Sequence, residues 1–245
     1  MNTKDAFLNN ANRRFVDVDD DEHLITLQPP AAAERVAEIE REIGFSLPVE
    51  LRDLLELTAG IDLDDGRLDG IDVASVGHCA IAELFKWVIT LTGDGAGNFW
   101  LIELHEGQTT LGPVWFLCHD APVLIYQSAD LATFVEDYLR YCAAPNDGPI
   151  DEVVRHAVRR VAAQTDDPPC TTLRGSPDRV LSKFARTLTD EWFIADLRNA
   201  QIGDGMPLAR YGITTPLARA GNEFVFAYGS RSLWERLTGF FTGRR

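Results

Sequence analysis

The chain has 245 residues, of which 45% are hydrophobic and 25% charged, a composition typical of a globular protein. No apolar run reaches the roughly 18 residues that a membrane-spanning helix needs, and the first fifteen residues lack the apolar centre of a signal peptide. These features exclude fibrous and membrane-spanning proteins, and we expect a protein of the cytoplasm.

The charge is strongly negative and unevenly distributed. The net charge is -15, and residues 1–145 hold 26 Asp and Glu against 9 Lys and Arg, whereas residues 146–245 hold 12 against 14. Such a chain repels nucleic acid and anionic membranes but attracts a basic protein. A negative charge also keeps ordinary proteins soluble, so the charge alone does not establish a basic partner. The 4 cysteines form no CxxC pair and are predicted to be free thiols.

The N-terminal part predicts an acidic arm followed by a pair of helices. The arm spans residues 1–30 and ends at two prolines. Apolar residues at helical spacing then predict one helix that ends at Gly44 and a second that begins at Pro48 and ends at Gly60. This helical pair opens the predicted domain.

Short apolar runs further along predict an antiparallel sheet. An Asp-rich loop is expected between Gly60 and Gly77. Runs rich in β-branched and aromatic residues then predict strands at 87–91, 99–104, 114–117 and 123–126. Connections this short join antiparallel strands. A helix over 131–142, capped by Ser128, completes an α+β domain that spans residues 31–143.

A linker at 143–149 is predicted to lead into a smaller α+β extension over residues 150–245. Helical spacing predicts a helix from Ile150 to Val161 and another that opens at Ser176, and apolar runs predict strands at 193–197 and 224–227. A capping box at Ser232 predicts a last helix. The sequence leaves open whether this extension packs against the first domain.

The motifs give little support for catalysis or for a cofactor. The glycine-rich run at 92–97 joins two strands, whereas phosphate-binding loops precede a helix, so we predict a turn with positive φ angles. His119 and Asp120 could bind a metal ion, but no other histidine has ligand spacing, and a structural role is favoured. We therefore expect neither catalytic residues nor a cofactor.

Several motifs together resemble the Smi/Knr branch of the SUKH superfamily over about residues 31–142. They are, in chain order, Ile39-Glu40, the GFSLP run at 44–48, the GDGAGNFW run at 93–100, Gly112-Pro113-Val114, His119-Asp120, and the helix with Leu131 and Phe134. The resemblance implies an α+β domain without established enzymatic activity. It further implies, for bacterial members, an immunity protein that neutralises a toxin, often a nuclease, and for the fungal branch a regulatory protein.

We therefore predict a non-enzymatic bacterial immunity protein whose acidic half covers a basic toxin domain. The expected contact residues are Asp62, Asp64, Asp65, Asp69, Asp72, Asp94, Trp100, His119 and Asp120. Trp100 fits the core equally well. Two alternatives stay open: a regulatory scaffold like the fungal relatives, and a metal-dependent enzyme that uses His119, Asp120 and Asp94. The sequence identifies neither the toxin nor the oligomeric state.

Overall fold

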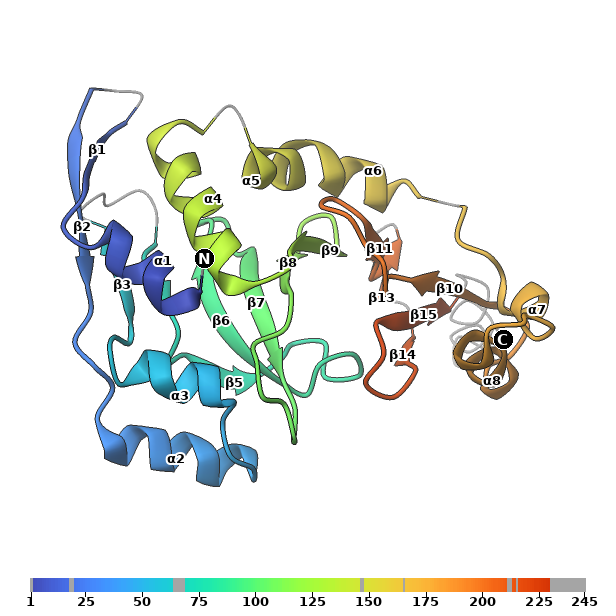
Figure 1. Cartoon of the computed structure of the whole chain (residues 1–245). Coiled ribbons are helices and arrows are strands. Elements are labelled where there is room, and N and C mark those ends of the chain that lie inside the picture. Colours follow the sequence, from blue (N-terminus) through green and yellow to red (C-terminus); the bar gives the residue numbers. More distant parts are fainter. Residues whose placement is uncertain are drawn as a thin grey trace, which may run out of the picture.

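A six-stranded antiparallel sheet forms the centre of the structure, a computed structural model that describes residues 2–17, 20–63, 69–145, 148–164, 166–210, 213–214 and 216–229. The strand order is β11-β9-β8-β7-β6-β5 (Figure 1). The strands are β5 (Val76–His78), β6 (Trp87–Gly93), β7 (Phe99–Leu104), β8 (Val114–Cys118), β9 (Val123–Ser128) and β11 (Gly205–Pro207). The four predicted strands are thus confirmed as β6 to β9.

Both faces of this sheet are covered, which explains why its strands are almost wholly apolar. Trp100, Ile102 and Phe116 share one core with the N-terminal helices and with α4 (Leu131–Ala143). Leu101 and Trp115 point to the opposite face and share a second core with the C-terminal part of the chain. The central sheet therefore joins the two parts of the molecule.

The predicted acidic arm is part of the fold. It contains α1 (Thr3–Asn10) and two paired antiparallel strands, β1 (Arg14–Val16) and β2 (Glu22–Leu27). Phe7 on α1 is fully buried, because this helix packs against α3 (Val49–Leu55) and α4. β2 pairs with β3 (Gly60–Leu63), and β3 with β4 (Ile71–Asp72), in a separate four-stranded sheet. The arm thus contributes a helix to the core and two strands to a sheet.

The helical pair is confirmed, but the predicted end of the second helix was wrong. The first helix is α2 (Ala33–Ile43), and its cap residue Gly44 has a φ of 86°. The second helix, α3, ends at Leu55, and Gly60 begins β3 instead. A Cβ atom at Gly60 would lie 1.9 Å from the carbonyl oxygen of Ile71. Gly60 is therefore required by close strand pairing.

The closing helix begins at the predicted residue, but its cap lies two residues after the predicted one. Asp130 caps α4, because its Oδ1 accepts a hydrogen bond from the Thr133 amide at 2.8 Å. Ser128, the predicted cap, is the last residue of β9, and its hydroxyl donates to the Asp130 carbonyl. The cap is therefore the Asp130 carboxylate and not the predicted Ser128 hydroxyl.

The C-terminal part begins with a nearly continuous helical stretch. It comprises α5 (Pro149–Asp151), a π-helical turn (Glu152–Ala157) and α6 (Val158–Ala162). The later elements are α7 (Cys170–Leu173), α8 (Arg179–Thr187), β10 (Trp192–Asp196), β12 (Ala209–Arg210), β13 (Ile213–Thr214), β14 (Leu217–Arg219) and β15 (Val225–Gly229). A three-stranded sheet has the order β10-β15-β14. The last predicted helix, with Ser232, lies outside the described residues.

The extension packs against the first domain, which answers the question that the sequence leaves open. β11 pairs with β9 and so forms one edge of the central sheet. Phe226 and Tyr228 of β15 lie in the same core as Leu101 and Trp115. Figure 1 shows the N-terminal helices on one side of the central sheet and α8 with the three-stranded sheet on the other. Among the described residues, no helix is long and apolar enough to cross a membrane.

Candidate functional site

The glycine-rich turn between β6 and β7 is folded around one carboxylate. The Oδ1 atom of Asp94 accepts hydrogen bonds from the amides of Ala96 and Asn98, at 2.9 and 3.1 Å. Gly95 and Gly97 have φ angles of 72° and 90°, as the glycine pattern predicts. The turn is therefore held in one conformation by its own side chain.

Asn98 ties this turn to the next one along the sheet. Its side chain is buried, and its Nδ2 atom donates to Asp94 Oδ2 at 2.6 Å. Its Oδ1 atom accepts from the amide of His119, in the β8–β9 turn, at 2.9 Å. The ring of His119 lies over Gly97, where a Cβ atom would be 2.9 Å from it. Asp120 Oδ1 lies 3.1 Å from His119 Nε2 at the surface.

Asp69 is anchored on the other side of the turn. Its carbonyl oxygen accepts a hydrogen bond from the hydroxyl of Tyr138 at 2.8 Å and another from Thr92 at 3.2 Å. Tyr138 is fully buried on α4, and burial raises the pKa of its hydroxyl, so it remains a donor. The Asp69 carboxylate reaches Gly93, where a Cβ atom would be 3.1 Å from its Oδ2.

Trp100 belongs to the core, so its assignment as a contact residue was wrong. The residue is 1% exposed, its Nε1 donates to Gln127 at 3.0 Å, and its ring packs against Phe134. Side chains alternate along a strand, and the neighbouring Phe99 therefore points to the other face, where it is 42% exposed. Sequence reasoning missed Phe99, although strand alternation would have placed it opposite a buried Trp100.

The structure brings together only part of the predicted contact set. We call the group formed by Asp69, Asp94, Phe99, His119 and Asp120 the glycine-turn surface. Asp62 and Asp72 lie on β3 and β4 of the other sheet. The first accepts a hydrogen bond from Gln28 at 2.8 Å and the second one from the Ala74 amide at 2.7 Å. Asp64 and Asp65 lie outside the described residues.

The metal alternative needs a third ligand beside His119 and Asp120. Over the described parts of the chain, no three His, Cys, Asp or Glu side chains are placed to hold a metal ion together. Asp94, the third residue of that hypothesis, uses both carboxylate oxygens in the turn. The geometry is that of an acidic surface with one exposed aromatic ring.

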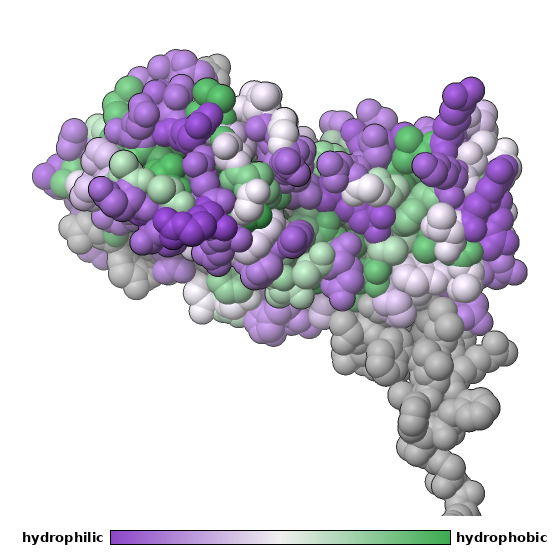
Figure 2. Space-filling model, turned by 90° about the horizontal axis from the view of Figure 1, so that it is seen from below, coloured by the Kyte–Doolittle hydropathy of each residue, from purple (hydrophilic) through white to green (hydrophobic). Residues whose placement is uncertain are grey.

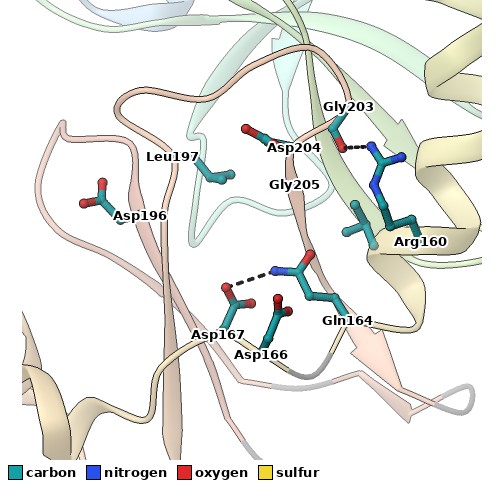
Figure 3. Close-up of a pocket in the computed structure, with 10 residues that line it drawn as sticks. Arg160, Gln164, Asp166, Asp167, Asp196, Leu197, Gly203, Asp204 and Gly205 are labelled. Carbon is teal, nitrogen blue, oxygen red and sulfur yellow. Dashed lines mark hydrogen bonds between the residues drawn. The ribbon is translucent and has the colours of Figure 1, made fainter.

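A polar pocket lies apart from this surface, in the C-terminal part. The cavity, of about 390 Å³, is lined by α6, by the loop before β11 and by the end of β10 (Figure 3). Asp167 accepts from Gln164 at 3.0 Å, and Arg160 donates to the Gly203 carbonyl at 3.2 Å. Of the sequence-predicted contact residues that the structure describes, none lines it.

The comparison with protein families agrees with the fold. The helical pair, the antiparallel sheet and the closing helix form an α+β domain. Residues 30–137 match the model of the SMI1 / KNR4 family (SUKH-1), so this part of the chain is a domain of that family. All residues of the glycine-turn surface fall within the matched segment. The searches of curated proteins and of solved structures gave no match.

Proposed function

We propose that the chain is a non-enzymatic immunity protein that neutralises a basic toxin domain by binding to it through the glycine-turn surface. The observation that carries this proposal is the exposed ring of Phe99, which lies with the Asp69 carboxylate against Gly93, next to the turn that holds Asp94. Such a combination suits protein contact. An aromatic ring that becomes buried in an interface supplies affinity, and the charges around it select the partner.

The rigidity of the surface supports the same function. Asn98 holds two turns together, and Tyr138 fixes the backbone at Asp69. Groups that are already ordered lose little conformational entropy when a partner binds. A preorganised acidic surface is therefore expected to bind more tightly than the same charges on a mobile loop.

The sign of the charge indicates the class of partner. A nuclease needs a cationic surface in order to hold phosphates. An acidic protein that covers such a surface blocks substrate access without touching the catalytic chemistry, and its charge accelerates association. The family domain supports a protein-binding role, and toxin neutralisation is the form of it that this charge favours.

The test is rescue of growth in cells that express a candidate toxin domain encoded beside the gene for this chain. The double variant Asp69→Lys/Asp120→Lys should lose rescue, because both exposed carboxylates become cations. The matched control Glu106→Lys/Asp166→Lys changes the net charge equally at exposed positions outside the glycine-turn surface and should still rescue. Equal rescue by both double variants, at equal protein levels, would refute a role for this surface.

A further inference from the structure

A second surface with a different chemistry lies on the C-terminal part. A groove of about 510 Å³ runs between α8 and the turn that joins β14 to β15. Its lining includes Val180 and Phe184 from α8 and Ala220 from the turn. Phe184 is buried against the three-stranded sheet, and Val180 is half-buried. The groove therefore has an apolar floor on rigid elements.

The charges around this groove are mainly positive. Arg179 and Lys183 lie four residues apart on α8, so their side chains share one side of the helix. Both residues are exposed. Among the described residues, Glu223 is the single acidic one in the lining. Figure 2 views the molecule from below. On the half that contains α8, it shows hydrophobic residues among strongly hydrophilic ones.

Arg219, which also lines the groove, is turned inward. Its guanidinium donates to the carboxylate of Glu103 and to the carbonyl of Leu84, and its side chain is 5% exposed. The cations available to a ligand are therefore those on α8. They face solvent above an apolar floor, which is an arrangement for a ligand that is both anionic and hydrophobic.

We propose that this groove binds a linear acidic peptide segment of a partner protein. A large apolar side chain of the segment would enter between Val180 and Ala220, and its carboxylates would pair with Arg179 and Lys183. Charge complementarity favours this occupant. The net charge of -15 disfavours extended polyanions such as nucleic acid and anionic membranes, which face a large part of the surface, more than a short peptide that meets only the groove. The inference is independent of the glycine-turn surface, which has the opposite charge.

The test is fluorescence anisotropy of the full chain with a labelled peptide, Glu-Leu-Asp-Phe-Glu-Leu. The variants Arg179→Glu and Lys183→Glu should each weaken binding about tenfold or more, and Ala220→Leu, which fills the groove, should abolish it. The matched control Arg159→Glu makes the same charge change on α6, outside the groove, and should leave the affinity unchanged.

Control peptides and a second assay separate the possible results. A peptide with Lys in place of its acids should not bind, and neither should one with Ala in place of Leu and Phe. The proposal is overturned if the original peptide fails to bind, or if Arg159→Glu weakens it as much as Lys183→Glu. It is also overturned if binding appears only after removal of residues 230–245, or if Lys183→Glu instead dissolves a dimer of the chain in light scattering.

Discussion

Gly97 and Asn98 shape the glycine-turn surface together with Asp94. The ring of His119 occupies the space where any other residue at 97 would place its Cβ atom. Asn98 then fixes the backbone of His119 and the carboxylate of Asp94 with a single buried amide. The positions of the charged groups thus depend on two uncharged residues of the turn.

Replacing Gly97 tests this arrangement. Gly97→Ala should lower the free energy of unfolding by more than Gly95→Ala, since both have positive φ but only Gly97 has the His119 ring within 4 Å. The strain of a positive φ should cost about 1–2 kcal/mol in both variants. Urea denaturation measures the difference, and adding His119→Ala to Gly97→Ala should remove it. Equal costs for the two glycines would contradict the packing of His119 on the turn.

Residue patterns singled out the acidic side chains around the glycine-rich turn but not the exposed Phe99 ring. Asp69, Asp94, His119 and Asp120 were expected and are brought together. Phe99 was missed because the larger neighbouring Trp100 was the expected aromatic contact residue. The support from Tyr138 was not predictable, because its hydrogen bond to Asp69 joins residues 69 positions apart in the chain.

At the scale of elements, periodic patterns predicted the helices and strands well and their ends less well. The strand at 99–104 is found with the predicted bounds, as β7. The ends depend on single contacts, such as the cap hydrogen bond of Asp130 and the close backbone approach at Gly60. The periodic spacing of apolar residues does not predict such contacts. The π-helical turn before α6 is a further feature without a signal in the apolar spacing.

The start of α8 gives a prediction about pH. Asp178 caps this helix, and Arg198 donates to both Asp178 and Asp196, at 2.8 and 2.6 Å. These hydrogen bonds from Arg198 are the main reason why the pKa values of both carboxyl groups are lowered. A carboxyl group whose pKa is lower in the folded than in the unfolded protein stabilises the folded state. This stabilisation is complete above the usual Asp pKa of about 3.9, and it is lost as the pH falls through the pKa of the folded state.

We therefore expect the free energy of unfolding to fall on acidification below about pH 4, and to fall less steeply in Arg198→Gln, which lacks the guanidinium. Urea denaturation over a series of pH values measures both slopes. Arg159→Gln, an exposed arginine on α6, is the control and should keep the slope of the wild type. Identical slopes for Arg198→Gln and the wild type would show that this contact does not couple to folding.

At the scale of the whole molecule, the C-terminal part completes the family domain. β11 is a three-residue strand of Gly, Met and Pro, a composition from which no strand could be predicted. Its pairing with β9 and the shared core beneath β15 appear only in three dimensions. The composition of the chain changes at the linker predicted at 143–149, but the core does not end there.

The ion pair between Arg219 and Glu103 should be a strong link between the two parts. Both side chains are almost fully buried, at 5% and 11% exposed. Arg219→Ala leaves a buried carboxylate without its partner and should lower the free energy of unfolding by about 3–5 kcal/mol. The double variant Arg219→Met/Glu103→Leu should lose less, because it removes both charges. A loss below about 1 kcal/mol for Arg219→Ala, as for an exposed pair, would contradict this view.

Calorimetric titration of the chain with the candidate toxin domain encoded beside its gene tests the central claim most directly. Truncation of a central aromatic contact commonly costs 2 kcal/mol or more, so Phe99→Ala should raise the Kd about thirtyfold. Leu8→Ala removes a similarly exposed apolar side chain on α1 and should leave the Kd unchanged. The wild-type Kd should also rise with salt. Wild-type affinity in Phe99→Ala, together with a Kd that does not depend on salt, would contradict binding through the glycine-turn surface.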